Sequence, residues 1–292
     1  MQINPSYAPL GSRGVLEVAG ADRAAFLQGL VSNDVTKAGP GRAVFAALLT
    51  AQGKYLHDFF IIALDDRLYL DCEAARLADF KKRLNLYKLR SQVSLDDASG
   101  RFAVAASWGD GVLAKLGLND AGAAREFAGG VAYADPRLSG LGARFLIPRG
   151  REAEIAKLGF ARADDAAYDK HRLSLGVPDG SRDLEVEKSI LLENGFEELN
   201  GVDFAKGCYM GQELTARTKY RALIKKRLLP VTVDGPLPAP GTSIMAGAEE
   251  VGEIRSGAGG VALAMLKLDA LSGPLTAGGA KLVPFKPDWA KF

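Results

Sequence analysis

The sequence is poor in the two residue types that most often bind metals. Its 292 residues contain only two cysteines, Cys72 and Cys208, and only two histidines, His57 and His171. Two cysteines are too few for a disulfide framework, which favours a reducing compartment. With so few of these side chains, we expect no four-ligand zinc or iron–sulfur site built from cysteine and histidine alone.

Excess charge and long apolar runs are also missing. The 37 basic residues nearly cancel the 35 acidic ones and leave a net charge of +2. The chain therefore lacks the positive field of a typical nucleic-acid-binding protein, and any anion site must be local. Residues 59–64 form the longest core-like run, far too short to cross a bilayer, and residues 1–7 lack a charged start followed by an apolar run. We expect a cytoplasmic protein with no membrane partner and no stable nucleic-acid binding.

What the chain does have is enough apolar residues, 48%, for two or three compact units with cores of their own. In the first hundred residues, alternation and turn residues predict a strand meander accompanied by two amphipathic helices. The expected strands are residues 14–19, 43–49, 54–64 and 68–72. The expected helices are residues 24–30 and 73–86.

The middle and the end of the chain predict two further types of structure. Residues 102–160 show short strands (102–106, 143–147) and helical segments (112–116, 152–158), which is typical of a small two-layer α+β unit. A helix over residues 168–175 should end at the Gly- and Pro-rich turn that follows. From Leu228 onward, short apolar runs between Val, Pro and Gly indicate a small all-β module, with a boundary near Lys226.

The most informative stretch is residues 206–213, KGCYMGQE. Its glycines flank Cys208 and allow backbone conformations closed to other residues, so the thiol can lie on an open turn. The ammonium of Lys206 favours a thiolate, which is the nucleophilic and metal-binding form. Local chemistry leaves two interpretations open: a working thiol, or a small buried side chain on a tight turn.

Other chemistries fit the sequence less well. A nucleophilic triad needs a base beside Cys208, and both histidines are distant in sequence. A dinucleotide fold needs a Gly-x-Gly-x-x-Gly turn, which residues 207–211 do not supply. The basic run 217–227 can contact RNA phosphates, but Tyr220 is its only interleaved aromatic, so a solvated basic face is the better interpretation.

An acidic small molecule with a polar heterocycle matches the residues better. Side chains suited to an amino-pyrimidinone edge are Glu193, Gln212 and Glu213. Side chains suited to a carboxylate tail are Arg217, Lys219 and Arg221. Folates have this shape and charge, although spacing alone does not select folate over another acidic ligand.

Five segments resemble the YgfZ family of folate-binding proteins, relatives of the glycine-cleavage T protein, an aminomethyltransferase. They are residues 26–34 (FLQGLVSND), 48–58 (LLTAQGKYLHD), 172–178 (RLSLGVP), 191–194 (LLEN) and 206–217 (KGCYMGQELTAR). The resemblance covers nearly the whole chain. It implies an α+β fold: an aminomethyltransferase-like folate-binding body with an embedded ferredoxin-like unit and a C-terminal small β-barrel.

The implied domains are 1–100 and 166–226 for the two halves of the folate-binding body, 101–165 for the ferredoxin-like unit and 227–292 for the barrel. The implied function is a tetrahydrofolate-binding protein that assists the assembly or repair of iron–sulfur proteins of the four-iron type, with effects on tRNA modification. Its partners would be iron–sulfur apo-proteins or assembly machinery. The cysteine count agrees, because this chain can share one thiolate with a cluster but cannot hold a four-cysteine cluster itself.

The resemblance also implies site residues. The chemical group consists of Cys208 as the working thiol with Lys206 and Asp58. The group for tetrahydrofolate or a one-carbon derivative consists of Glu193, Gln212, Glu213, Arg217, Arg221, Arg172 and Asn33. No resident metal is expected, although Cys208 is a candidate for a transient cluster ligand. The alternative is a folate-dependent aminomethyltransferase acting on a lipoyl-bound carrier.

Two departures from the aminomethyltransferases weigh against that alternative. Ser174 stands at the position of the glutamate that holds the pteridine in their Arg-x-Glu-x-Gly stretch, and a hydroxyl cannot replace a carboxylate's paired acceptance. In their Gly-Gly-x-x-Asp-Asp turn, this chain keeps Asp58 but has His57 in place of the other aspartate. We therefore expect either weaker pteridine binding or Glu193 as a substitute carboxylate, and we expect ligand binding more than transfer chemistry.

Overall fold

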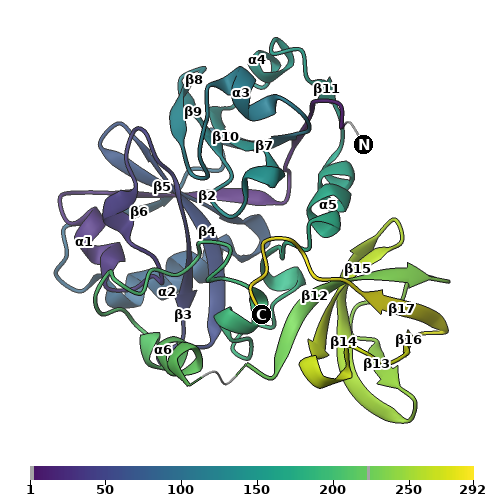
Figure 1. The fold of residues 1–292 in the computed structure, drawn as a ribbon. Coiled ribbons are helices and arrows are strands. Elements are labelled where there is room, and N and C mark those ends of the chain that lie inside the picture. The colour runs from purple at the N-terminus through teal and green to yellow at the C-terminus, as the bar shows by residue number, and fades with distance from the viewer. Residues whose placement is uncertain (1–2, 222–223) are drawn as a thin grey trace. The chain divides into compact units, whose positions relative to one another are not determined.

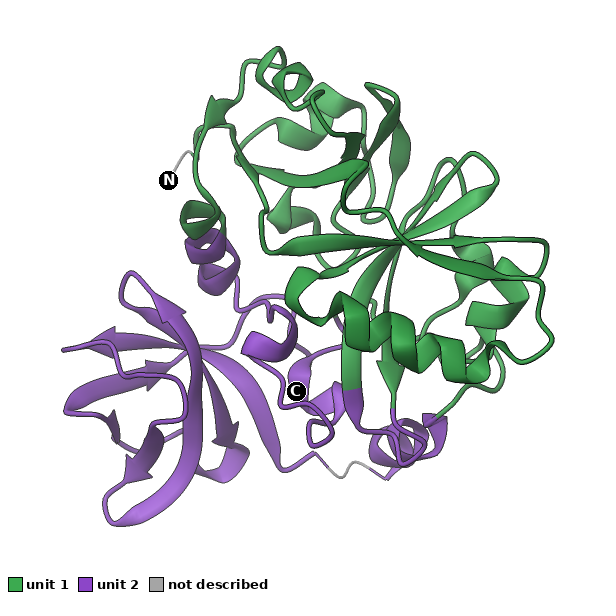
Figure 2. Cartoon of the chain, turned by 180° about the vertical axis from the view of Figure 1, so that it is seen from behind, with its two compact units in different colours: residues 1–49, 56–168, 199–210 green, residues 50–55, 169–198, 211–292 purple. Residues whose placement is uncertain are grey.

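The computed structural model describes residues 3–221 and 224–292 (Figure 1). The chain divides into two compact units (Figure 2). Unit 1 comprises residues 1–49, 56–168 and 199–210, and unit 2 comprises residues 50–55, 169–198 and 211–292. Each unit therefore combines segments that are distant in sequence. The four-part division expected from the resemblance stays a prediction.

One sheet of unit 1 has five strands in the order β3-β4-β5-β2-β6. Their bounds are β2 (Arg13–Ala19), β3 (Val44–Leu49), β4 (Tyr55–Leu64), β5 (Arg67–Glu73) and β6 (Ser94–Asp97). The predicted meander over β3, β4 and β5 is confirmed. Helix α2 (Leu77–Lys88) buries Leu77, Phe80 and Leu84, which share one face at three- and four-residue spacing.

The second sheet of unit 1 has the strand order β11-β1-β7-β10-β9-β8. Its strands are β1 (Ser6–Pro9), β7 (Phe102–Trp108), β8 (Ala124–Phe127), β9 (Gly130–Ala134), β10 (Ala143–Pro148) and β11 (Ala161–Arg162). Helices α3 (Val112–Leu116) and α4 (Ala153–Ala156) contribute Val112, Leu116 and Ile155 to a core with Phe145. Strand β1 is absent from the sequence-based predictions, because four residues ending in proline carry too short an alternation to predict a strand.

A buried ionic cluster joins the two sheets of unit 1. Asp71 on β5 accepts hydrogen bonds from Arg13 Nε on β2 at 2.6 Å and from Arg144 Nη2 on β10 at 2.7 Å. Tyr133 on β9 donates to the same carboxylate at 3.2 Å. Burial opposes ionisation of Asp71, but the two guanidinium groups hold its pKa below its usual value. The sheets are thus linked by charge as well as by apolar packing.

Unit 2 ends in a closed barrel with the strand order β12-β15-β14-β13-β16-β17. Its strands are β12 (Lys226–Asp234), β13 (Ser243–Ala246), β14 (Glu249–Ala258), β15 (Val261–Lys267), β16 (Leu275–Ala277) and β17 (Ala280–Pro284). Its core includes Val231, Ile254, Leu266 and Leu282. The predicted all-β module is confirmed, and closure pairs the edges that short apolar strands would otherwise expose.

Four predicted helices have different ends in the structure. The helix expected over 73–86 is α2, which begins after the 3-10 turn Ala74–Arg76. The helix expected over 24–30 is α1 (Arg23–Gln28), because Val31 pairs with Leu48 as a β-bridge and pulls the chain out of the helix. The helix expected over 152–158 is the single turn α4, and the one expected over 168–175 is α5 (Asp165–Ser174). Helix α6 (Gln212–Tyr220) follows the cysteine motif. Among the described residues, no helix is long and apolar enough to cross a membrane.

Candidate functional site

The loop that carries Cys208 is fastened to the segment after α1. We call residues 199–210 the thiol loop, all of which belong to unit 1. Asn33 Nδ2 donates to the Asn200 carbonyl at 2.7 Å, and Ser32 Oγ donates to the Gly201 carbonyl at 2.6 Å. Asn33 also donates to the Phe45 carbonyl at 2.7 Å. The amide nitrogen of Asn33, expected to contact ligand, therefore holds the thiol loop against β3.

Lys206 anchors the same loop from the other side. Its Nζ donates to the carbonyls of Gln28 at 2.7 Å and Val31 at 2.6 Å, and it lies 5.1 Å from the centroid of the Tyr209 ring. Burial lowers the pKa of Lys206 to about 8, against the opposing charges of Asp34 and Asp203. In the described part of the chain, the ammonium contacts these carbonyls and this ring. An activating contact with the Cys208 sulfur stays a prediction.

The two cysteines differ in access. Cys208 is exposed, and the glycines on both sides take left-handed conformations, with φ of 91° at Gly207 and 79° at Gly211. Cys72 is buried on β5, where desolvation raises its pKa to about 12. The interpretation of Cys208 as a buried filler is therefore wrong, and the buried Cys72 is the cysteine with a structural role.

A cavity of about 570 Å³ lies within unit 1 beside the start of the thiol loop. Its lining residues are Asn33, Lys37, Arg42, Ala43, Val44, Phe45, Asp120, Ala121, Pro136, Asn200, Val202, Asp203 and Phe204. The cavity thus combines two aromatic rings, two cations and two carboxylates, and Lys37 pairs with Asp203 at 2.5 Å. Its size and mixed lining suit a small molecule with a planar part and an anionic part.

Of these lining residues, only Asn33 was predicted from the sequence as a site residue. The cavity draws on segments 33–45, 120–121, 136 and 200–204, which no local pattern connects. The Lys37–Asp203 pair alone spans 166 positions. The one usable signal was Ser32-Asn33-Asp34, whose side chains bond backbone groups at the end of a helix.

Adjacent residues His57 and Asp58 occupy β4. His57 lies 2.9 Å from Asp79 and stacks on Phe80, and burial lowers its pKa to about 4. The ring is therefore neutral at pH 7 and serves the packing of α2. Asp58 is also buried and, because successive strand residues alternate, it points to the opposite face, the one occupied by Phe60. Its chemical role stays a prediction.

Glu193 lies in unit 2 on a short 3-10 turn, Leu191–Asn194. It is 8% exposed, its nearest cation is Lys226 at 3.8 Å, and burial raises its pKa. The neighbouring Asn194 has a buried Oδ1 with no hydrogen-bond partner among the described residues. This corner therefore holds a protonatable carboxyl group and an open acceptor, both suited to a polar ligand.

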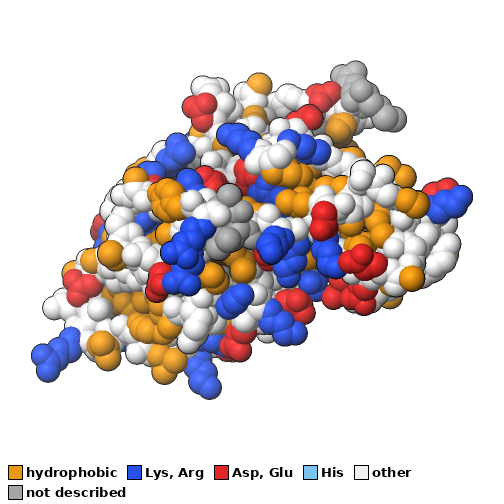
Figure 3. All heavy atoms as spheres, turned by 60° about the horizontal axis from the view of Figure 1, so that its bottom comes forward, with side chains coloured by type: hydrophobic (Ala, Val, Ile, Leu, Met, Phe, Trp, Pro, Cys, Tyr) orange, Lys and Arg blue, Asp and Glu red, His pale blue; other side chains and the backbone are white. Residues whose placement is uncertain are grey.

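The remaining polar candidates in unit 2 lie on helix α6 or at its C-terminal end. Gln212 is its first residue, Glu213 pairs with Arg217, and Lys219 pairs with Glu197 at 2.7 Å. Arg221 is exposed at the C-cap of α6. In Figure 3, basic side chains lie among acidic ones rather than in one continuous basic surface. This mixture agrees with local anion contacts better than with a polyanion track.

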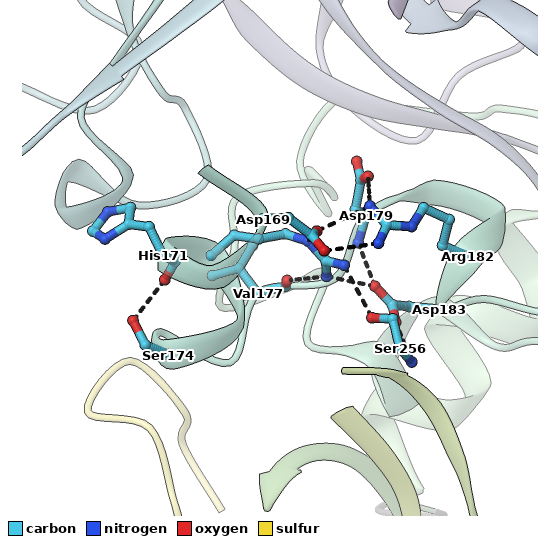
Figure 4. A network of polar contacts seen from close by, with 9 residues as sticks. Asp169, His171, Ser174, Val177, Asp179, Arg182, Asp183 and Ser256 are labelled. Atoms are coloured by element: carbon cyan, nitrogen blue, oxygen red, sulfur yellow. Dashed lines mark hydrogen bonds and ion pairs between the residues drawn. The ribbon is translucent and has the colours of Figure 1, made fainter. Parts of the chain in front are cut away.

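Arg172 belongs to the scaffold of unit 2 rather than to an open ligand site, because it bonds Asp169, Asp183 and Ser256, which are labelled in Figure 4. It is 2% exposed, and its guanidinium donates to Asp169 at 2.6 Å, Asp183 at 2.6 Å and Ser256 at 2.9 Å. These bonds tie α5 to the turn at Asp183 and to β14. The Ser174 hydroxyl donates to the His171 carbonyl at 2.7 Å, which is a bond within the same helix.

The structure therefore brings only some of the predicted residues together. Asn33, Lys206 and Cys208 meet at the thiol loop of unit 1, and Asp58 lies in the same unit. The other predicted ligand residues belong to unit 2: Glu193, Gln212, Glu213, Arg217, Arg221 and Arg172.

Comparisons with known proteins agree with this architecture. Residues 11–117 match the GCVT N-terminal domain, and residues 225–292 match the CAF17 C-terminal beta-barrel domain. The glycine cleavage system aminomethyltransferase T of Bartonella henselae has a similar structure, with a TM-score of 0.80 over 99% of this chain and 87% of that chain. Its sequence identity is 14%, so the likeness shows the fold alone. The expected aminomethyltransferase-like fold is confirmed.

Two relatives in sequence carry the same name. The mitochondrial iron–sulfur cluster assembly factor IBA57 of Homo sapiens is 34% identical over 305 residues, covering 96% of this chain and 84% of the relative. The corresponding Mus musculus protein is 33% identical over 289 residues, covering 91% and 78%. These relatives are IBA57 proteins, so the expected kinship is confirmed at the level of the aminomethyltransferase-like fold rather than for YgfZ itself. The chain belongs to the family of the iron–sulfur cluster assembly factor IBA57.

Proposed function

We propose that this chain assists iron–sulfur protein assembly by presenting the Cys208 thiolate as a ligand to a cluster in transit. The observation that carries the proposal is a single exposed cysteine on an anchored loop, in a chain whose relatives are named iron–sulfur cluster assembly factors. One thiolate supplies one iron ligand, so the other ligands come from a donor or recipient protein. The cluster is cargo, and ligand exchange with the recipient releases it.

The narrower parts of the proposal come from the resemblance. The clients are four-iron proteins, including enzymes that modify tRNA, and the chain acts as YgfZ proteins do in a reducing cytoplasmic compartment. The two-cysteine composition supports this, because a lone accessible thiol avoids disulfide formation only where thiols stay reduced.

A second part of the proposal is that tetrahydrofolate or a one-carbon derivative binds the chain. The cavity of unit 1 has a size that suits such a ligand: the half-buried Phe204 offers a flat surface for a pteridine, and Asp120 accepts hydrogen bonds from amino groups. Lys37 and Arg42 supply charge for a carboxylate tail. Bound folate would supply a one-carbon carrier, and these residues would hold and orient it.

The thiol role is tested by complementation in cells that lack this protein. We expect Cys208→Ala to abolish maturation of a four-iron enzyme, measured as activity per amount of enzyme. Cys72→Ala is the matched control, and we expect it to retain maturation because Cys72 is buried. Full maturation with Cys208→Ala would refute the proposed function.

The folate role is tested by calorimetry with tetrahydrofolate. Arg42 is exposed at the cavity, and reversing its charge with Arg42→Glu should weaken binding by about tenfold or more. Arg162→Glu, an exposed charge reversal on β11 away from the cavity lining, is the control and should bind like wild type. If no binding heat is detected at millimolar tetrahydrofolate, the proposal of folate binding is refuted and the proposal for the Cys208 thiol is unaffected.

A second candidate function is a true aminomethyltransferase, favoured by the structural likeness to the Bartonella henselae enzyme. An assay with an aminomethyl-lipoyl donor and tetrahydrofolate decides between the two. Because His57 is buried against Asp79 and Ser174 bonds its own helix, we expect no methylene-tetrahydrofolate above background. Turnover that depends on Asp58 would favour the transferase.

A further inference from the structure

We propose that Lys206 is a positioning residue that fixes the thiol loop in place, and that it acts through the loop rather than by direct activation of the Cys208 thiol. The inference rests on the proposed function of Cys208 and adds the element that sets where its sulfur lies. It is carried by the hydrogen bonds along residues 199–210, which hold the loop before Gly207 and after Cys208.

The upstream part of the thiol loop is bonded at short intervals. Asn200 and Gly201 accept bonds from Asn33 and Ser32, as described above. The Asp203 amide donates to the Ser32 carbonyl at 3.0 Å, and the Asp203 carboxylate caps the Ala205 amide at 2.7 Å. This part of the loop therefore runs alongside the segment after α1 and is hydrogen-bonded to it.

Lys206 supplies the last anchor before the cysteine. The carbonyls of Gln28 and Val31 lie at and just beyond the C-terminal end of α1, where carbonyls lack partners within the helix. A lysine near such an end satisfies them and meets their partial negative charge. Two of the three N–H bonds of the ammonium are used in this way.

A separate anchor follows the cysteine. Tyr209 is buried with its ring under the Lys206 ammonium, and the Met210 amide donates to the Gly29 carbonyl at 3.1 Å. Only Gly207 and Cys208, both exposed, stand between the two anchors. Consecutive Cα atoms are about 3.8 Å apart, so two residues held at both ends leave the thiol only a few ångströms of movement.

This arrangement separates positioning from activation. The Lys206 ammonium is saturated by two carbonyls and an aromatic face, all of which would lose their partner if the side chain were replaced. The Cys208 side chain is already exposed in the anchored loop. Loss of Lys206 should therefore release the loop while leaving the thiol accessible to small reagents.

The test compares wild type with Lys206→Met, which keeps the length of the side chain and removes its donors. We expect amide hydrogen exchange at Asp203 and Met210 to accelerate by about tenfold or more, as expected for local opening. At one fixed pH, iodoacetamide should alkylate Cys208 within about threefold of the wild-type rate, because accessibility is unchanged and Cys72 is buried. Maturation of a four-iron enzyme should fall by about tenfold.

Three further variants complete the experiment. Lys206→Arg should restore part of both loop protection and maturation, because a guanidinium can donate to two carbonyls. Lys206→Gln replaces Lys206→Met in the same comparison if the latter does not fold. Lys267→Met removes an exposed lysine that pairs with Glu249 and should match wild type in every measurement.

Unchanged exchange together with a tenfold slower alkylation of Cys208 would overturn the proposal, because it would make Lys206 an activator. Faster exchange in Lys206→Met supports the anchoring even if Cys208→Ala matures clients normally. In that case the proposed function fails and the anchoring survives, so the two are separable.

Discussion

Asp71 gives the sharpest test of how unit 1 is held together. Its side chain has no solvent exposure, and it accepts bonds from Arg13 and Arg144, whose side chains are 6% and 3% exposed. Replacing Asp71 with asparagine keeps the shape but removes the negative charge. Two buried guanidinium groups then lie together with no carboxylate between them, and the asparagine NH2 group adds donors where only acceptors fit.

The magnitude follows from the burial. Breaking a buried ion pair by removing one partner costs about 3–5 kcal/mol, because the remaining charge stays out of water without compensation. We expect Asp71→Asn to lower the free energy of unfolding by about this amount, measured by urea denaturation followed by fluorescence and circular dichroism. Exposed Asp66→Asn is the matched control and should change it by less than about 0.5 kcal/mol.

Further variants separate the ion pair from simple loss of packing. Arg144→Met alone should cost a similar amount, since it leaves Asp71 with one guanidinium and the Tyr133 hydroxyl. The double variant Asp71→Asn with Arg144→Met should cost less than the sum of the two single changes, because the groups interact directly. A loss below about 1 kcal/mol for Asp71→Asn would refute the view that this cluster joins the sheets.

Three other predictions concern the scaffold. The folded pKa of His57, about 4, lies below the unfolded value of 6.5, so its stabilising contribution is complete above pH 6.5 and is lost as pH falls toward 4. Between these pH values the free energy of unfolding, measured by urea denaturation, should fall by about 3 kcal/mol more for wild type than for His57→Gln. If the two proteins lose stability in parallel as pH falls, His57 is not the group responsible. Gly142→Ala should destabilise unit 1 by about 2 kcal/mol or more in thermal unfolding, because φ is 84° and the new Cβ would lie 2.1 Å from the Ser107 carbonyl oxygen; an unchanged midpoint would contradict this. Arg172→Met should lower the free energy of unfolding by about 3–5 kcal/mol, because it leaves the buried Asp183 carboxylate without its cation. Arg182→Met, at an exposed neighbour, is the control, and an equal loss in the two variants would contradict a special structural role for Arg172.

Much of the fold was readable from local patterns. The amphipathic face of α2, the meander of β3 to β5 and the barrel from β12 follow from the spacing of apolar residues and from turn residues between them. Helix ends were less predictable. Helix α1 stops at Gln28 because a bridge between Val31 and Leu48 competes with the next helical turn, and no local sequence records that pairing.

Of the candidate site, the sequence by itself determined which side chain is the candidate thiol, and the structure decided that this thiol is exposed. Glycines at 207 and 211 permit the left-handed turns, and a total of two cysteines leaves Cys208 no disulfide framework or four-cysteine cluster to join. Tertiary structure decided the roles of its neighbours. The ammonium of Lys206, which the sequence favoured as a neighbour of the thiolate, lies on the end of α1. The guanidinium of Arg172, which the resemblance assigned to the ligand, lies in a buried network. The physical reason is that a polar side chain bonds whatever the fold places within about 3 Å of it, and that neighbour is often more than a hundred residues away.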